Sequence, residues 1–275
     1  MAIIVEPLKP HILIRGKAVS PHIKLDLFSS KSIVLDTAMG YGVDIAAVKK
    51  TFPDAEVHGI DSNIVMRDDV WEDNSWKGLE YSYGRARDVV KSALGSDILP
   101  SCNVKRGSAL KLDFEKNRFN KILSIALLHH LCRDERKASF EEAYRVLKKN
   151  GLYIAASISC EILDKFSDMK GRYSRESIDE KLPDGARNKR YDRDKKDEFA
   201  EEVKKITRRC GLEPTPEDMG IITAAVSDDS WVVSELRSDI IRSDLRSVGY
   251  SKIYVNDYSN SRFRYHKLIN IVAVK

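Results

Sequence analysis

The residues of this sequence that could do chemistry stand at the ends of its apolar runs. The stretch "VLDTAMGYG" places Asp36 at the end of one run, followed by a turn that holds Gly40 and Gly42. Glycines let backbone N–H groups approach a ligand closely, and the positive end of the helix that follows attracts an anion. The next run, "VHGID", ends in Asp61, 25 residues after Asp36. A carboxylate there can accept hydrogen bonds from both hydroxyls of a ribose, so the spacing favours a nucleoside ligand.

Two later runs end in residues that the same ligand could contact. The third run is followed by Ser108 and Ala109, where a polar side chain could meet an adenine amino group. The fourth strand ends in Ile125 and Ala126 and is followed by "LLHH". We expect all four run ends to lie along one nucleoside.

These run ends need elements that bring them to one edge, and the sequence alternates between strand and helix patterns. Continuous apolar runs predict buried parallel strands, and spaced apolar residues predict helices. We expect strands at 32–38, 55–61, 103–112, 120–131 and 152–159 and helices at 43–52, 86–94 and 134–151, then a helix at 234–250 and two strands at 252–258 and 267–275. This order predicts an α/β fold, a doubly wound and mostly parallel sheet with helices on both faces, in which ligands bind at the carboxyl ends of the strands.

The run ends together resemble the class I S-adenosylmethionine-dependent methyltransferases. The resemblance rests on "VLDTAMGYG", "VHGID", "GSALKLDF", "FNKILSIALLHHL" and "RVLKKNGLYI", and it covers residues 31 to 159 and the closing helix and hairpin. It implies a seven-stranded Rossmann-like sheet with one antiparallel strand, and S-adenosyl-L-methionine as the cofactor. The first turn lacks the G-x-G-x-x-G spacing, which disfavours a dinucleotide-binding oxidoreductase.

The resemblance also implies roles for individual residues. The residues that match the family's cofactor site are Asp36, Ala38, Gly40, Gly42, Asp61, Ser108, Ala109, Ile125 and Ala126. Two of them depart from the family pattern. Ala38 stands where glycine is usual, and an alanine is tolerated there only if its φ is negative. Ser108 stands where aspartate is usual, so it can form a hydrogen bond without charge.

His129 and His130 are the candidate catalytic residues, because they stand at the same predicted edge. Methyl transfer needs a base only if the acceptor must lose a proton, and an ordinary histidine pKa suits that role. The alternative is that one histidine packs or caps while the other lines the pocket. Asp134 is better explained as the acid at the start of the following helix.

Four segments follow from this interpretation. Residues 1–30 form an N-terminal extension, 31–159 the cofactor-binding core, 160–233 a charged insertion that covers the substrate, and 234–275 the closing helix and hairpin of the core. Residues 62–101 form a second insertion.

Charge is concentrated in the insertion. Arg187–Arg209 holds ten Lys/Arg and six acids, a net +4 in a chain of net charge +5, and Arg262–Lys267 is also basic. These segments could bind RNA phosphates, or they could be solvated surfaces of mixed charge. The stretch "SIALLHHLCRDERKASFEEAYRVLKKNG" is similar to the tRNA wobble-uridine methyltransferases, which act on a carboxymethyl group. The motif Asp/Asn-Pro-Pro-Tyr, which family members acting on amide or exocyclic amino nitrogens place after the fourth strand, is absent. The Pro-Cys pair of the RNA cytosine-C5 enzymes is absent too.

Composition limits the setting. No apolar run reaches the length of about 18 residues that a membrane span needs, and the first residues lack a signal-peptide layout. The cysteines are widely spaced, which predicts neither a metal site nor a disulfide framework and favours a cytoplasmic protein. They are Cys102, Cys132, Cys160 and Cys210.

Three functions stay open. The first is an RNA methyltransferase acting on tRNA, and the second is a small-molecule methyltransferase whose pocket the insertions cap. The third is a methyltransferase-fold binding subunit without activity, which Ala38 and Ser108 motivate. The sequence does not determine the oligomeric state.

Overall fold

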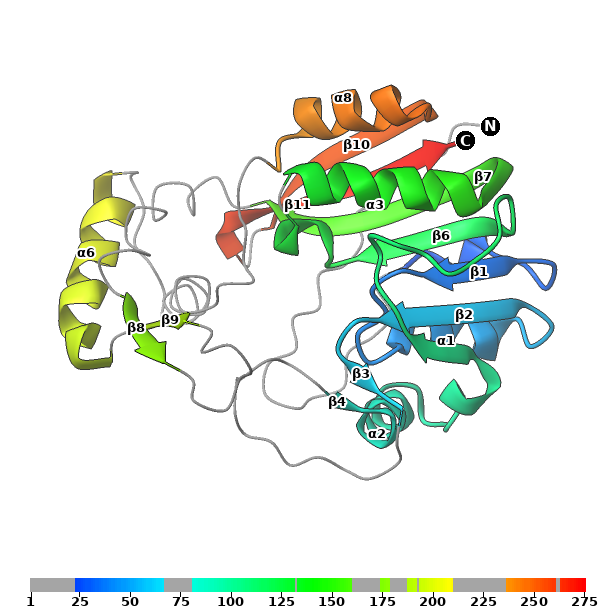
Figure 1. Ribbon diagram of the computed structural model, residues 1–275, viewed down its shortest axis with the longest axis horizontal. Coiled ribbons are helices and arrows are strands. Elements are labelled where there is room, and N and C mark those ends of the chain that lie inside the picture. The colour runs from blue at the N-terminus through cyan, green and yellow to red at the C-terminus, as the bar shows by residue number, and fades with distance from the viewer. Residues whose placement is uncertain are drawn as a thin grey trace.

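The computed structural model describes residues 23–66, 81–131, 133–159, 174–178, 187–191, 193–209, 236–260 and 263–275. The centre of the molecule is a seven-stranded sheet in the order β10-β11-β7-β6-β1-β2-β5 (Figure 1). Its strands are β1 (Ile33–Asp36), β2 (Glu56–Asp61), β5 (Asn103–Arg106), β6 (Phe119–Ile125), β7 (Leu147–Ser159), β10 (Ser251–Asn260) and β11 (Phe263–Val274).

The strand directions create one edge where a ligand can bind. β1 pairs in parallel with both β2 and β6, β2 with β5, and β6 with β7. β11 is antiparallel to both of its neighbours, β7 and β10. The chain runs outward from β1 through β2 to β5, then returns to the other side of β1 at β6. That reversal makes the carboxyl ends of β1 and its neighbours the expected ligand edge of the sheet.

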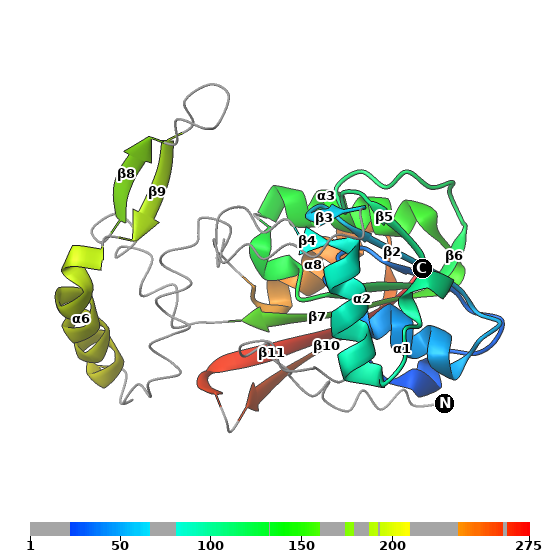
Figure 2. The same cartoon turned by 90° about the horizontal axis from the view of Figure 1, so that it is seen from below.

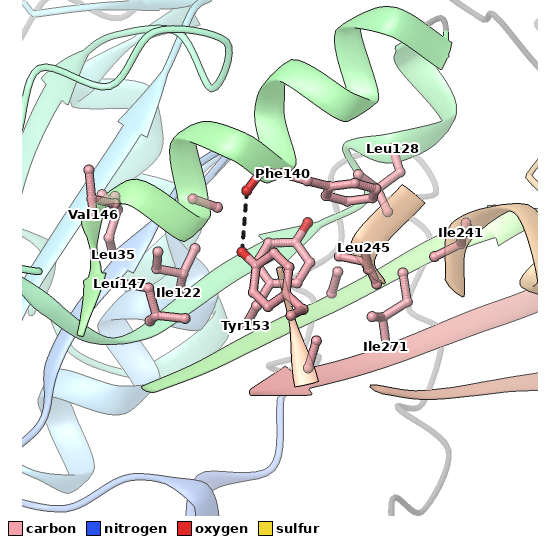
Figure 3. Packing of buried hydrophobic residues seen from close by; sticks show 14 of the residues in the cluster. Leu35, Ile122, Leu128, Phe140, Val146, Leu147, Tyr153, Ile241, Leu245 and Ile271 are labelled. Atoms are coloured by element: carbon pink, nitrogen blue, oxygen red, sulfur yellow. Dashed lines mark hydrogen bonds between the residues drawn. The ribbon is translucent and has the colours of Figure 1, made fainter. Parts of the chain in front are cut away.

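Helices cover both faces of the sheet. α1 (Val43–Thr51) and α2 (Tyr83–Leu94) contact each other and share the first apolar cluster with β1 and β2. α3 (Arg133–Val146) and α8 (Ser238–Val248) contact each other over the opposite face. Figure 3 shows Phe140 and Leu245 from these helices among Ile122, Tyr153 and Ile271 of the sheet. The predicted doubly wound, mostly parallel seven-stranded fold is confirmed.

Several predicted boundaries differ from the observed ones; for example, β5 ends at Arg106, so residues 107–112 are the exit loop of the third strand. The fourth apolar run, 120–131, does not form one strand: β6 ends at Ile125, the strand end expected at the ligand site, and Ala126 adopts a left-handed φ of +56°. A short 3₁₀ turn, η3 (Leu128–His130), follows. The third helix was expected to run to residue 151 but ends at Val146, where the fully buried Leu147 begins β7 by pairing with Phe119.

The remaining described elements lie in the insertions and loops. They are η1 (Leu25–Leu27), β3 (Ile64–Val65), β4 (Tyr81–Ser82), η2 (Leu99–Ser101), β8 (Ser174–Ile178), β9 (Arg187–Tyr191), η4 (Arg193–Lys195) and α6 (Lys196–Arg209). Figures 1 and 2 show the β8–β9 hairpin and α6 beyond the carboxyl ends of β6 and β7, set apart from the sheet. Most of the predicted N-terminal extension and much of the 160–233 insertion lie outside the described residues.

In the described part of the chain, no helix has the length and apolar character needed to cross a membrane. The same residues contain no cluster of three or more His, Cys, Asp or Glu side chains that could hold a metal ion. Cys102 is buried as a free thiol.

Candidate functional site

The glycine turn after β1 is fixed to the strands on both sides of it. On the β6 side, Thr37 donates hydrogen bonds from its backbone N–H and its hydroxyl to the carbonyl of Leu123, at 3.0 and 3.1 Å. On the β2 side, the N–H of Met39 donates to the carbonyl of Ile60 at 3.0 Å. Asp36 is buried and accepts the N–H of Ala38 at 3.1 Å. The turn therefore has a defined conformation at the ligand edge of the sheet.

The two glycines of the turn differ in the space around them. Gly40 and Gly42 have left-handed φ values of +51° and +81°, a region that favours glycine. A Cβ on Gly42 would lie 2.8 Å from Leu99, whereas a Cβ on Gly40 would meet no heavy atom within 4 Å. The Gly40 side of the turn thus faces open space, which leaves room for a ligand. Ala38 is outside the left-handed region, so its methyl group causes no backbone strain.

Asp61 lies directly against this turn. Its Oδ2 accepts the N–H of Gly40 at 3.0 Å, and its Oδ1 accepts the N–H of Asn63 at 2.9 Å. Each carboxylate oxygen keeps a further lone pair, so two ribose hydroxyls could still bind. Burial raises the pKa of Asp61, and the hydrogen bonds from Asn63 and Gly40 oppose that rise.

The end of β5 reaches the same place. The N–H of Gly107 donates to the backbone carbonyl of Asp61 at 3.1 Å, which sets Ser108 and Ala109 beside the acid. Ser108 is exposed, and its hydroxyl accepts the N–H of Leu110 at 3.2 Å, while Ala109 is buried. This is a surface on which a flat base could lie.

The end of β6 closes the other side of the turn. Ile125 is buried in the cluster that also holds Met39 of the turn. Ala126 is exposed, and its N–H donates to the carbonyl of Ala156 at 2.7 Å, which holds the strained backbone in place.

The two candidate catalytic histidines have different surroundings. His129 is 4% exposed, and its Nδ1 lies 2.9 Å from the hydroxyl of Ser157, which also accepts the His129 backbone N–H at 3.2 Å. His130 is less buried, and its ring centroid lies 4.1 Å from that of His129. His129 is thus bonded to β7, and His130 is the more accessible of the two histidines.

The sequence interpretation missed one residue of this edge. The hydroxyl of Tyr81 donates a hydrogen bond to the carbonyl of Gly40, and its ring lies 4.9 Å from that of Tyr41. In the sequence, Tyr81 is one of several aromatics in a polar stretch, and no spacing connects it to the glycine turn.

The fold and the site together form a sheet edge that a nucleoside would fit. Residues 35–155 match the family described as "Methyltransferase domain". This part of the chain is similar to methyltransferase domains, and S-adenosylmethionine is the cofactor that the family resemblance implies. The open side of Gly40 and the carboxylate of Asp61 fit that cofactor, because they offer backbone contact and a ribose acceptor.

Individual proteins are similar to this chain over part of their length. A protein of Encephalitozoon cuniculi named "Putative methyltransferase" is 36% identical over 100 residues, which cover 34% of this chain and 43% of that protein. A possible exported protein from Bordetella parapertussis has a TM-score of 0.50 at 14% identity, covering 89% of this chain and 61% of that one. Phosphoethanolamine N-methyltransferase 2 from Haemonchus contortus has a TM-score of 0.49 at 13% identity, covering 90% of this chain and 49% of that one. The chain thus spans less than two thirds of each of these relatives.

Proposed function

We propose that this protein is an active methyltransferase whose acceptor is RNA, with tRNA as the substrate class. One observation carries the choice of acceptor: the basic β9 strand and the basic end of α6 lie beyond the carboxyl ends of β6 and β7, on the side of the cofactor edge (Figures 1 and 2). The similarity of residues 124–151 to the tRNA wobble-uridine enzymes supports the same choice.

The residues at the strand ends have distinct tasks in this proposal. S-adenosylmethionine supplies a methyl group on a sulfonium, which is already activated for in-line displacement. Asp61 holds the ribose, and the turn at Gly40 lets the backbone lie against the cofactor. Ser108 and Ala109 contact the adenine. The protein's contribution is to align acceptor and methyl group and to exclude water.

The surroundings of the histidines favour an acceptor that needs no base. A carboxylate such as a carboxymethyl group is already a nucleophile at neutral pH, so no proton has to be removed. His129 is buried against Ser157 and is not available to a large acceptor. The catalytic role of His129 and His130 stays a prediction, with His130 the better placed.

The charge on α6 is divided along the helix. Its first half carries exposed acids, including Asp197, Glu198 and Glu201, and its second half carries exposed bases, including Lys205 and Arg209. Acids at the N-terminus and bases at the C-terminus both stabilise the helix through its dipole. Only the C-terminal half therefore presents a basic surface to phosphates. The basic segment Arg262–Lys267 lies partly outside the described residues.

The other two functions are outcomes of the experiments. A small-molecule acceptor would leave RNA unmethylated. A binding subunit without activity was motivated by Ala38 and Ser108, and the unstrained backbone of Ala38 removes the first of these reasons. The cytoplasmic location stays a prediction.

Calorimetric titration with S-adenosylhomocysteine tests the cofactor site first. We expect binding to the wild type and loss of binding in Asp61→Ala, because the ribose loses its acceptor. If the wild-type protein binds no S-adenosylhomocysteine, the proposal of an active methyltransferase is refuted and the binding-subunit alternative remains.

Transfer of labelled methyl groups then tests the acceptor, with unmodified bulk tRNA and a small-molecule extract as parallel substrates. Lys205→Ser, Arg208→Ser and Arg209→Ser combined should weaken tRNA binding and flatten its log–log salt dependence by about 2–3, since each phosphate contact contributes ~0.7–0.9. The matched control on the same helix is Asp197→Asn, Glu198→Gln and Glu201→Gln, which should not weaken tRNA binding. Methylation of the extract alone would refute the RNA proposal.

A further inference from the structure

Tyr81 reaches the cofactor edge from within the 62–101 insertion. Its backbone N–H donates to the carbonyl of Asn63 at 3.0 Å, and Tyr81 pairs with Ile64 in the short parallel ladder of β3 and β4. Ser82 then caps α2 by accepting the N–H of Arg85 at 3.0 Å. Tyr81 is thus held between a strand pair that starts three residues after Asp61 and a capped helix start.

The side chain of Tyr81 extends from this position to the glycine turn. Its hydroxyl donates to the carbonyl of Gly40, and its ring packs against Tyr41 with centroids 4.9 Å apart at 58°. The N–H of the same Gly40 donates to Oδ2 of Asp61. Side chains therefore hold both backbone polar groups of Gly40, its N–H and its carbonyl.

The hydroxyl of Tyr81 also interacts with Asp61. Burial raises the pKa of Asp61, and hydrogen bonds from Asn63, Gly40 and Tyr81 oppose that rise. Burial and the nearby Asp61 charge raise the pKa of Tyr81, so its hydroxyl keeps its proton and remains a donor. The Tyr81 hydroxyl therefore donates to the Gly40 carbonyl and lies close enough to the Asp61 carboxylate to influence its charge.

We propose that Tyr81 is a positioning residue for the ribose of S-adenosylmethionine, acting through Asp61 and Gly40. It holds Gly40 in its left-handed conformation so that the Gly40 N–H orients the carboxylate. When ribose hydroxyls donate to Asp61, the Tyr81 proton stays on the Gly40 carbonyl, and the carboxylate keeps its lone pairs for the ribose. This inference rests on the cofactor-binding role in the proposed function and adds a residue that the family resemblance did not supply.

Tyr81→Phe tests the inference because it removes the hydroxyl and keeps the ring contact with Tyr41. Affinity for S-adenosylhomocysteine should fall about tenfold, the usual effect of losing a hydrogen bond to a buried polar group. Tyr144→Phe is the matched control, since Tyr144 packs on Tyr250 in the opposite apolar cluster, and it should leave the affinity unchanged.

A second ligand separates positioning from general support of the loop. The 2′-deoxyribose analogue of S-adenosylhomocysteine lacks one hydroxyl that Asp61 would accept. The wild type should prefer S-adenosylhomocysteine over this analogue, and Tyr81→Phe should reduce that preference. Partial unfolding of the variant would weaken both ligands equally, so the ratio stays informative even if the variant is less stable.

The outcomes distinguish a failure of the role proposed for Tyr81 from a failure of the proposed function. If the wild type binds S-adenosylhomocysteine and Tyr81→Phe changes neither affinity nor preference, the inference is overturned and the proposed function stands. An equal loss for both ligands would also overturn it, because Tyr81 would then only support the fold. If the wild type binds neither ligand, the proposed function fails and the inference fails with it.

Discussion

Gly59 lies in the middle of β2, underneath the glycine turn, and Gly59→Ala tests how closely the turn must pack. An added Cβ would lie 2.6 Å from Cδ1 of Ile45 and closer still to Sδ of Met39. Both side chains are buried, Ile45 completely. Because ordinary contacts between such atoms are about 3.5–4.0 Å, Ile45 and Met39 must retreat by about an ångström.

The expected cost follows from two opposing effects. Overpacking a filled core costs about 1–3 kcal/mol, and restricting the unfolded chain with alanine returns about 0.4–1 kcal/mol. We therefore expect a net loss of about 1–2 kcal/mol, or a fall in Tm of roughly 2–8 °C for a chain of this size. Affinity for S-adenosylhomocysteine should fall as well, since Met39 is bonded to Ile60 and precedes Gly40.

Thermal melts followed by circular dichroism and calorimetric titration measure the two effects. Gly107→Ala is the control, because its nearest contact would be Cβ of Ile60 at 3.3 Å, which needs only a small adjustment. If Gly59→Ala melts with the wild type and binds S-adenosylhomocysteine equally well, the close packing of the turn on β2 does not position the site.

Two further predictions concern buried polar groups. Because burial raises the pKa of Asp61 in the folded protein, affinity for S-adenosylhomocysteine should rise with pH from about pH 4 as the carboxylate forms. The stability of the ligand-free protein should fall as the pH rises through the same range, since the folded state binds the proton more tightly than the unfolded state. Calorimetric titrations and thermal melts across pH check both trends, and Asp61→Asn should remove both. Asn270 is 1% exposed on β11, and neither polar atom of its amide has a hydrogen-bond partner in the part of the chain that the structure describes. Asn270→Leu should stabilise the protein by about 1–3 kcal/mol. The control Asn120→Leu should destabilise it, because the Asn120 side chain forms hydrogen bonds with the backbone of Ile33 and Lys31. Urea unfolding measures both changes, and a loss of stability in Asn270→Leu would contradict the reasoning.

The predicted strands show what apolar patterning can and cannot fix. Runs such as 32–38 and 55–61 contain the observed β1 and β2, because a strand buried on both faces needs apolar residues throughout. The run at 120–131 stays apolar past Ile125, so apolar patterning alone does not mark the end of the strand. Ala126 ends the strand through its backbone conformation, and no pattern of side-chain polarity reports a positive φ at alanine.

The candidate site divides in the same way. Asp61 and Gly40 could be proposed together from sequence, because each ends or follows a strand and parallel strands end at one edge. Their direct hydrogen bond agrees with that reasoning. The sequence could not assign different roles to His129 and His130, because adjacent residues with the same side chain are equivalent until their bonding partners are known.

By itself, the sequence determined the order of the elements, the kind of sheet and the residues at the ends of its strands. Those properties depend on local polarity and on glycine, which act within a few residues of the chain. Only the tertiary structure decided that His129 is bonded to Ser157, 28 residues away, and that Tyr81 holds Gly40 across 41 residues. A hydrogen bond depends on where two atoms lie in space, and the spacing of residues along the chain does not contain that information.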